Sequence, residues 1–215
     1  RPWFRLAVPD KVLNEFQPVK NWLTLVADRM NTVFFRSNLY NALPIIYGDM
    51  GVFSTGCMLM EEDSKQVVKF YPFAVGSYAI AQDSNLKTNT FYREFRLSVA
   101  QLIEKFGKFD KDNKVINWDD FSTHVKDLYE NGQTQAWIDC YHFITPNKYY
   151  NPNKLGSEFK KYTSIYYEKS SGSGSLDFSS MDNRALRTSG YDFFPVLTPR
   201  WEVNGEDVYG TDCPG

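Results

Sequence analysis

The apolar positions in the first quarter of the chain recur at the spacing of an α-helix. Between residues 11 and 36 they come every three or four residues, at Val12, Phe16, Val19, Leu23, Val26, Met30 and Val33. This period predicts an amphipathic helix. Pro18 fits the first turn of that helix, with 11–16 as a separate turn. A short strand over 3–8 is expected before it. Ser37 and Asn38 are placed to cap a second helix over about 38–54, which contains Pro44.

From residue 56 onward the pattern changes to the two-residue period of strands. Short apolar runs at 57–61, 67–73 and 77–82 are separated by polar turns at 62–65 and 83–85. Residues 87–97 alternate, with Phe91, Phe95 and Leu97 on one parity and Tyr92 and Glu94 on the other. This alternation is typical of half-buried antiparallel strands, so the sequence predicts a β meander over 56–97.

The remaining sequence mixes short helices with long strands. Ser98 and Gly107 bracket a predicted helix over 99–106, and Asn117 precedes another over 118–130. Strands are expected over 135–144, 161–169, 184–189 and 196–203, with a Pro/Asn-rich loop at 146–157. The Ser/Gly run 170–175 has the composition of a flexible linker, and is either a native hairpin tip or an engineered splice. We expect 170–180 to be mobile.

These elements predict an α+β fold, in which N-terminal helices pack on antiparallel β meanders and hairpins, with short helices between the β units. The expected order is a mainly helical 1–55, a β meander over 56–97, short helices over 98–132, and a second β unit over 133–210 with a flexible loop at 146–183. No apolar run reaches the length of a membrane span, and no signal peptide is visible. Because the first residue is Arg1, we expect the chain to be a piece of a longer protein.

Composition favours a packed, β-rich fold and argues against attraction of nucleic acid by net charge. Hydrophobic residues make up 42% of the chain and aromatic residues 17%, which favours a packed core with a strong β component. The net charge is −2, so no basic excess draws nucleic acid by bulk electrostatics. Cys57, Cys140 and Cys213 are an odd number without a CxxC pair, which fits a reducing compartment better than a disulfide scaffold.

The segment 109–121 is similar to a calcium-binding loop but fails at its essential positions. Such a loop needs oxygen ligands at positions 1, 3 and 5, Gly at 6 and Glu at 12. Counted from Asp110, Lys114 stands at position 5, Val115 at 6 and Phe121 at 12. We interpret the segment as a polar turn followed by an Asn117 cap, and expect titration with Ca²⁺ to find no site there.

No other pattern identifies catalytic, cofactor-binding or metal-ligating residues. The chain has no GxSxG, Walker loop or GxGxxG. Of its two histidines, His124 lies on a predicted helix; His142 lies on a predicted strand, where it shares a face with Cys140. A metal site is conceivable there, but a core or interface pair is favoured. Carboxylates such as those at 61–63 and 119–120 fit solvated turns and helix starts.

Two further interpretations remain open. Tyr149-Tyr150 and Tyr166-Tyr167 are interspersed with lysines, a mixture that can stack on single-stranded nucleic acid, although lysines also protect edge strands from aggregation. The lysines are Lys148, Lys154, Lys160 and Lys161, and Glu158 and Glu168 dilute their charge. Exposed aromatic side chains on loops 146–157 and 191–201 would instead favour a β-rich module that binds a carbohydrate or a peptide. A hydrolytic enzyme without a recognisable motif is a third possibility.

Several segments, taken in order, resemble the portal (head-to-tail connector) proteins of short-tailed bacteriophages. The most similar run is DMGVFSTGCML at 49–59, where the family has a Gly-rich helix end followed by a strand. Each motif is weak alone, and the specific signal is their order along nearly the whole chain, with 146–183 matching poorly. The other matching segments are 1–6, 30–40, 69–73, 78–81, 88–95, 101–102, 189–195, 199–201 and 205–210.

The resemblance implies a structural role without catalysis or cofactors. Portal proteins form rings of about twelve copies at one capsid vertex, and contacts between unlike faces close such rings. Resemblance also implies capsid, scaffold, terminase and tail proteins as partners, with DNA passing through the ring without sequence-specific binding, and a location in the virion. The matched region corresponds to the peripheral wing, with the stem and clip outside it. We therefore expect the 215-residue chain alone to be monomeric or weakly associated.

Overall fold

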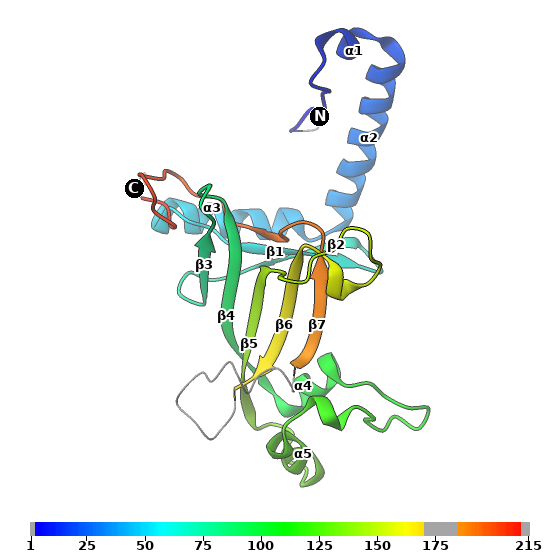
Figure 1. The fold of residues 1–215 in the computed structure, drawn as a ribbon, viewed down its shortest axis with the longest axis vertical. Coiled ribbons are helices and arrows are strands. Elements are labelled where there is room, and N and C mark those ends of the chain that lie inside the picture. Colours follow the sequence, from blue (N-terminus) through cyan, green and yellow to red (C-terminus); the bar gives the residue numbers. More distant parts are fainter. Residues whose placement is uncertain (1–2, 170–184, 212–215) are drawn as a thin grey trace. The chain divides into compact units, whose positions relative to one another are not determined.

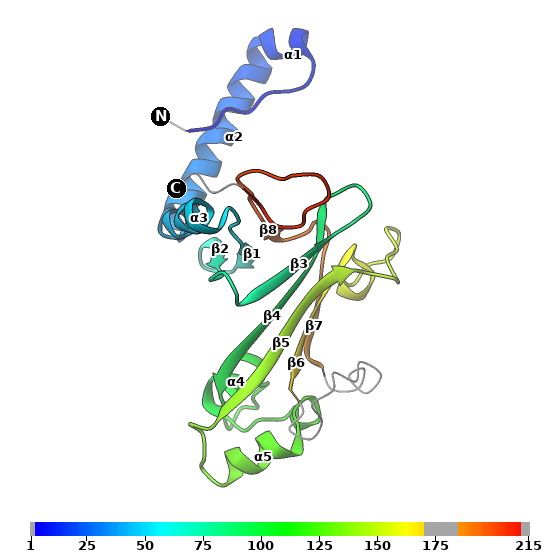
Figure 2. The same cartoon turned by 90° about the vertical axis from the view of Figure 1, so that its left-hand side faces the viewer.

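The computed structural model describes residues 3–169 and 185–211, and it divides into two compact units (Figures 1 and 2). Unit 1 comprises residues 1–73, 195–204 and 209–215, and unit 2 comprises 74–194 and 205–208. Each unit is built from helices and antiparallel strands, so the predicted α+β class is confirmed. The Ser/Gly run 170–175 lies outside the described residues. Within the described part of the chain, no helix combines the length and apolar character needed to cross a membrane.

Unit 1 begins with the predicted helices. The pattern over 11–36 forms α1 (Lys11–Glu15) and α2 (Gln17–Arg36), with Pro18 in the first turn of α2, as predicted. Asp10 starts α1, since its Oδ1 accepts a hydrogen bond of 2.8 Å from the amide of Val12. The expected strand over 3–8 was wrong. This segment finds no strand to pair with; instead, Phe4 contacts Phe34 of α2 edge-to-face.

Helix α3 (Leu39–Phe53) packs on a small sheet in unit 1. The sheet has the order β2–β1–β8, formed by Val67–Pro72, Met58–Asp63 and Val196–Leu197. Asn38 does not cap α3 through its side chain; its amide instead donates to Phe70 O at 2.6 Å and accepts from Phe70 N at 2.8 Å. The hydrophobic core between helix and sheet contains Leu39, Ala42, Ile46, Met58 and Phe70.

The predicted strand over 196–203 is shortened to the two residues of β8. Pro195 and Pro199 flank β8, and neither has an amide hydrogen for a ladder. Beyond them the chain makes single bridges, Thr55 with Arg200 and Glu202 with Thr211. The first bridge joins the C-terminal segment to the residues that follow α3, and the second pairs two parts of the C-terminal segment with each other.

Unit 2 contains a five-stranded antiparallel sheet with the order β3–β4–β5–β6–β7. The strands expected as one meander over 56–97 are shared between two sheets, since β2 ends at Pro72 and β3 does not pair with it. Proline lacks the N–H that would continue the ladder. The five strands of unit 2 are Tyr78–Gln82, Thr88–Ser98, Trp137–Pro146, Tyr162–Glu168 and Ala185–Tyr191.

The helices of unit 2 follow directly from their caps. Helix α4 (Val99–Phe106) has the predicted bounds, and a capping box joins Ser98 to Gln101. The helix expected over 118–130 is split into a 3₁₀ turn, η1 (Trp118–Asp120), and α5 (Thr123–Glu130). Asn117 was the wrong cap because its side chain bonds Lys108 N and Phe106 O; Ser122 caps α5 instead. A second 3₁₀ turn, η2, spans Ser157–Phe159.

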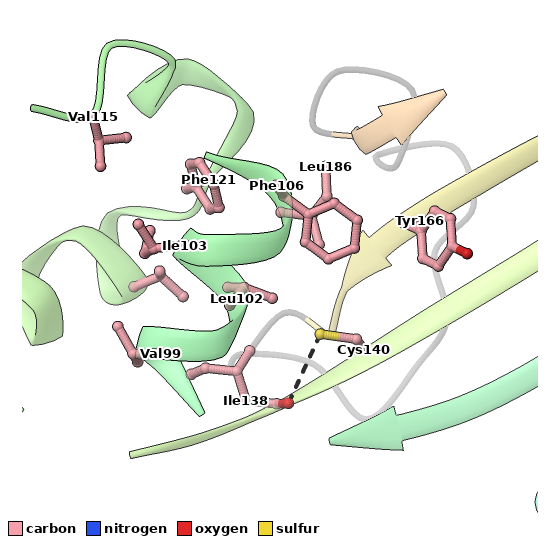
Figure 3. Packing of buried hydrophobic residues seen from close by; sticks show 11 residues of the cluster. Val99, Leu102, Ile103, Phe106, Val115, Phe121, Ile138, Cys140, Tyr166 and Leu186 are labelled. Carbon is pink, nitrogen blue, oxygen red and sulfur yellow. Dashed lines mark hydrogen bonds between the residues drawn. The ribbon is translucent and has the colours of Figure 1, made fainter. Parts of the chain in front are cut away.

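The core of unit 2 lies where α4 packs against the sheet (Figure 3). Phe91, Phe95 and Leu97 share one parity of β4, as predicted, and Phe91 is fully buried. In Figure 3 the side chains of α4 lie between the strands and the segment that carries Val115 and Phe121. The buried residues of this cluster are Val99, Leu102, Ile103, Phe106, Val115, Phe121, Val125, Ile138, Cys140, Tyr166 and Leu186.

Candidate functional site

The loop that is similar to a calcium site is held by its own hydrogen bonds. A bridge pairs Phe109 with Val115, and Asp110 Oδ1 accepts from the amides of Asp112 at 2.9 Å and Lys114 at 2.8 Å. Asn113 supplies the left-handed turn residue, with φ of 58°. The carboxylate expected at the first ligand position thus stabilises the turn. Among the described residues no three His, Cys, Asp or Glu side chains form a group that could hold a metal ion.

His142 and Cys140 share one face of β5, as their spacing predicts, and both are fully buried. Cys140 Sγ lies 3.8 Å from Ile138 O, and burial, with the nearby carboxylate of Glu168 adding to it, raises the pKa of its thiol to about 12. A thiol with so high a pKa is a poor nucleophile and a poor metal ligand. His124 lies on α5 and is exposed, so the structure does not bring the two histidines into one site.

A serine–histidine pair, which the sequence did not predict, lies in the sheet of unit 2. His142 Nε2 is 2.9 Å from Ser164 Oγ, the separation found between a nucleophilic serine and its base. The two residues are diagonal neighbours, because His142 pairs with Tyr166 in the β5–β6 register. Only that register brings them together, and no local motif in the sequence marks it.

The surroundings of this pair favour a structural role over catalysis. Both side chains are fully buried, and His142 Nδ1 has no hydrogen-bond partner, whereas a catalytic histidine is oriented by one. The imidazole stacks on Tyr166 with ring centroids 3.8 Å apart. Burial, helped by Arg93 and Lys105, lowers its pKa to about 2, so it remains neutral and is a weak base. The hydrogen bond therefore gives His142 Nε2 and the Ser164 hydroxyl a polar partner inside the core.

The tyrosine and lysine runs do not form one aromatic and cationic surface. Tyr149 and Tyr150 are exposed on the 146–157 loop, whereas Tyr166 is buried and Tyr167 is half-buried. Two of the lysines are engaged within unit 2: Lys160 pairs with Asp192 at 3.1 Å, and Lys154 lies 4.8 Å from the centre of the Phe159 ring. The geometry thus does not assemble the groups needed to track a single nucleic-acid strand.

The largest unexplained feature is apolar surface on the helices of unit 1. Helix α2 buries only Ala27, and Phe16, Trp22, Leu25 and Phe35 are exposed along it. Exposed apolar patches of this kind usually mark a contact with another protein surface. The periodic positions that predicted α2 are half-buried from Val19 to Val33, whereas the exposed Trp22 and Leu25 are apolar residues outside that periodic set.

Comparison with known proteins identifies the family. The profile described as "Bacteriophage head to tail connecting protein" matches residues 1–215. The "Portal protein" of Salmonella phage epsilon15 is 43% identical over 215 residues, which are 100% of this chain and 35% of that protein. The "Probable portal protein" of Bordetella phage BPP-1 is 36% identical over 210 residues, 98% of this chain and 34% of that protein. The chain spans about a third of the length of these curated relatives. It belongs to the bacteriophage head to tail connecting protein family.

Proposed function

We propose that the chain is a structural part of a phage portal, the ring at one capsid vertex through which DNA enters and leaves. The observation that carries the proposal is the family match over all 215 residues, together with the two portal relatives. In the intact protein about twelve copies close a ring through contacts between unlike faces. The capsid, scaffold, terminase and tail proteins are its further partners, and its place is the virion.

We also propose that the region is the peripheral wing of the subunit and that it has no catalytic role. Support for the second point comes from the serine–histidine pair, which is buried, lacks an orienting carboxylate and is a weak base. DNA passes through the ring without sequence-specific binding, and the near-neutral charge of this region supports a passage without strong non-specific attraction to the phosphate backbone. The wing acts as a scaffold between copies.

Light scattering and electron microscopy on the full-length protein test the portal assignment. A ring of one defined size, with residues 1–215 at its periphery, is expected. The 215-residue chain alone should remain monomeric or weakly associated, because a stable interface usually buries more than about 1,000 Å². A full-length protein that never forms rings at high concentration would contradict the assignment. A ring formed by the 215-residue chain alone would mean that this region carries the assembly contacts.

A second candidate is a module that binds a carbohydrate or a peptide. The observation in its favour is the exposure of Tyr149 and Tyr150 on one loop of unit 2. Aromatic side chains of this kind are common in binding loops. Glycan and peptide arrays probed with the full-length protein test it, with Tyr149→Ala as the variant. Specific capture that the variant loses, by a protein that forms no ring, would favour the module over the portal.

A further inference from the structure

We propose that neighbouring copies touch through unit 1, with the helical arm of one copy lying on the outer face of α3 of the next. The arm is defined as residues 3–36, which include α1 and α2, and the outer face as Ile45, Gly48 and Val52. This inference rests on the proposed ring and names one contact between its neighbouring copies. It concerns a surface whose occupant is a second copy of this chain.

The arm buries little of its apolar surface within the described chain. Helix α1 buries no residue, and Ala27 is the buried residue of α2. Trp22 is 59% exposed and Leu25 is 50% exposed; together with Arg29 they follow the three- and four-residue spacing that places side chains on one side of a helix. In proteins most of the stability of a helix comes from packing its apolar face against another surface. The arm therefore offers an apolar stripe that ends in a cation.

Helix α3 is apolar on two opposite sides, although the described part of unit 1 covers only one. Its inner side places Leu39, Ala42 and Ile46 in the core. On the outer side Ile45 is 50% exposed and Val52 is 65% exposed. Asp49 is the one charged residue between Leu39 and Phe53. A helix that is hydrophobic all round is normally buried all round, so the outer face of α3 has the character of an interface.

Gly48 gives that face room for a large side chain. A Cβ added at Gly48 would meet no atom within 4 Å, and the same holds at Gly51, one turn further along. Glycine at a helix surface lets another element approach the backbone closely. An aromatic ring such as that of Trp22 would fit between Ile45 and Val52 on either side of this gap. The outer face of α3 therefore has open space at its glycines and apolar side chains beside them.

Charge complementarity favours a second copy as the occupant. The arm carries five basic and three acidic residues; the other described residues of unit 1 carry three basic and five acidic residues. The arm of one copy and the body of the next therefore have opposite net charge, which directs them together and keeps like surfaces apart. Because the two surfaces differ, the contact is head-to-tail, the type that closes into a ring.

Crosslinking between differently labelled copies tests the contact directly. Full-length Trp22→Cys and Val52→Cys proteins would be mixed, assembled and oxidised, and crosslinked peptides identified by mass spectrometry. Only a contact between two molecules can join the two cysteines. The matched control replaces Trp22→Cys with Leu155→Cys, because Leu155 is 99% exposed in unit 2. We expect a 22–52 crosslink in rings and little of the 155–52 product; rings in which the two pairs crosslink equally would overturn the inference.

Charge insertion gives a second measurement. Trp22→Glu and Ile45→Glu should each weaken ring assembly by about tenfold or more, as for central residues of an interface. Leu155→Glu should leave assembly unchanged. All three positions are exposed, so melting temperatures of the dilute protein should not separate the variants. Rings that form normally with both charged variants would refute this contact but not the portal assignment. A wild-type protein that forms no ring would refute both.

Discussion

Units 1 and 2 use similar residues but differ in how completely they bury them. In unit 2, one cluster gathers eleven buried residues between α4, α5 and the five-stranded sheet. In unit 1 the cluster between α3 and its sheet contains five buried residues, and large apolar side chains along α1, α2 and α3 remain exposed. Both counts refer to the described residues. Unit 2 therefore gathers more buried side chains in one cluster, although Leu155 and Phe193 remain exposed in it, whereas the exposed apolar side chains of unit 1 lie along its helices.

This difference between the units shows that an aromatic-rich composition does not determine whether an apolar side chain lies in a core or on a surface. Burial of apolar surface stabilises a fold or an interface by the same physical effect. Phe91 is fully buried in unit 2, and Trp22 is exposed on the arm of unit 1, although both are large aromatic residues. Truncating a buried side chain in unit 2 should therefore lower the free energy of unfolding more than truncating an exposed side chain on the arm of unit 1.

The largest effect is expected in the core of unit 2. Leu102 is fully buried on α4, so Leu102→Ala should destabilise the chain by about 2–5 kcal/mol through lost transfer energy and the cavity left behind. Leu25→Ala on the exposed arm should change stability by less than about 0.5 kcal/mol. Urea unfolding of the 215-residue chain compares them. Equal losses would mean that the arm is packed as tightly as the core.

A second large effect is expected where two segments of unit 2 approach closely. A Cβ on Gly190 would lie 2.0 Å from Ser157 O and 2.9 Å from Lys160 Cβ, so β7 and η2 would have to separate. Gly190→Ala should cost about 1–3 kcal/mol, as overpacking does. The neighbouring Ser189→Ala is the control in the same urea experiment. A Gly190→Ala variant as stable as the control would show that η2 can move away from β7 at little energetic cost.

Local patterns predicted the elements of both units but not how the strands combine. Ser98 and Gly107 marked α4 to the residue, because a cap is a short-range hydrogen bond. The strand expected over 3–8 was wrong, since a strand needs a partner that local alternation cannot supply. The division of residues 56–97 between two sheets was likewise not visible, because β4 pairs with β5 from far along the chain.

For the candidate sites, too, the sequence predicted local features and missed contacts between distant segments. The failure of the calcium pattern could be read from Lys114 and Val115, since ligand positions are fixed within one loop. The contact of His142 with Ser164 depended on the β5–β6 register, and the exposure of Trp22 depended on what else lies near α2. Properties that depend on distant segments are thus the ones that sequence patterns missed.

The buried histidine predicts a pH effect of intermediate size. In the unfolded chain His142 takes up a proton near pH 6.5, whereas in the fold its pKa is about 2, mainly because it is buried. The unfolded state therefore binds more protons below pH 6.5, and stability falls as the pH falls, by about 1.4 kcal/mol per pH unit from this group. Urea unfolding of wild type and His142→Gln between pH 6 and 4.5 should show the steeper loss in wild type. Parallel curves would mean that His142 is protonated in the fold.

A smaller effect is expected at the start of α4. Ser98 Oγ accepts from Gln101 N at 3.3 Å and the Gln101 side chain accepts from Ser98 N at 3.1 Å. Ser98→Ala removes one half of this box and should cost about 1 kcal/mol. Ser84→Ala, in an exposed turn of the same unit, should cost almost nothing. Hydrogen exchange of α4 amides would locate the loss, and unchanged protection there would argue against the cap.

The smallest change in stability is expected at Gly48. One substitution there should raise the stability of the single chain and weaken the assembly of the ring. Glycine inside a helix costs roughly 0.5–1 kcal/mol relative to alanine, because the unfolded chain has more freedom to lose. A Cβ at this position would meet nothing within 4 Å, so Gly48→Ala should stabilise the 215-residue chain by about that amount. In the full-length ring the same methyl group would occupy space needed by the arm of the next copy. Assembly should therefore weaken while the melting temperature of the single chain rises.

Gly132→Ala is the contrasting control: its φ of 73° strains alanine, so it should lower stability without affecting assembly. A Gly48→Ala variant that stabilises the chain and assembles normally would mean that the outer face of α3 is open in the ring.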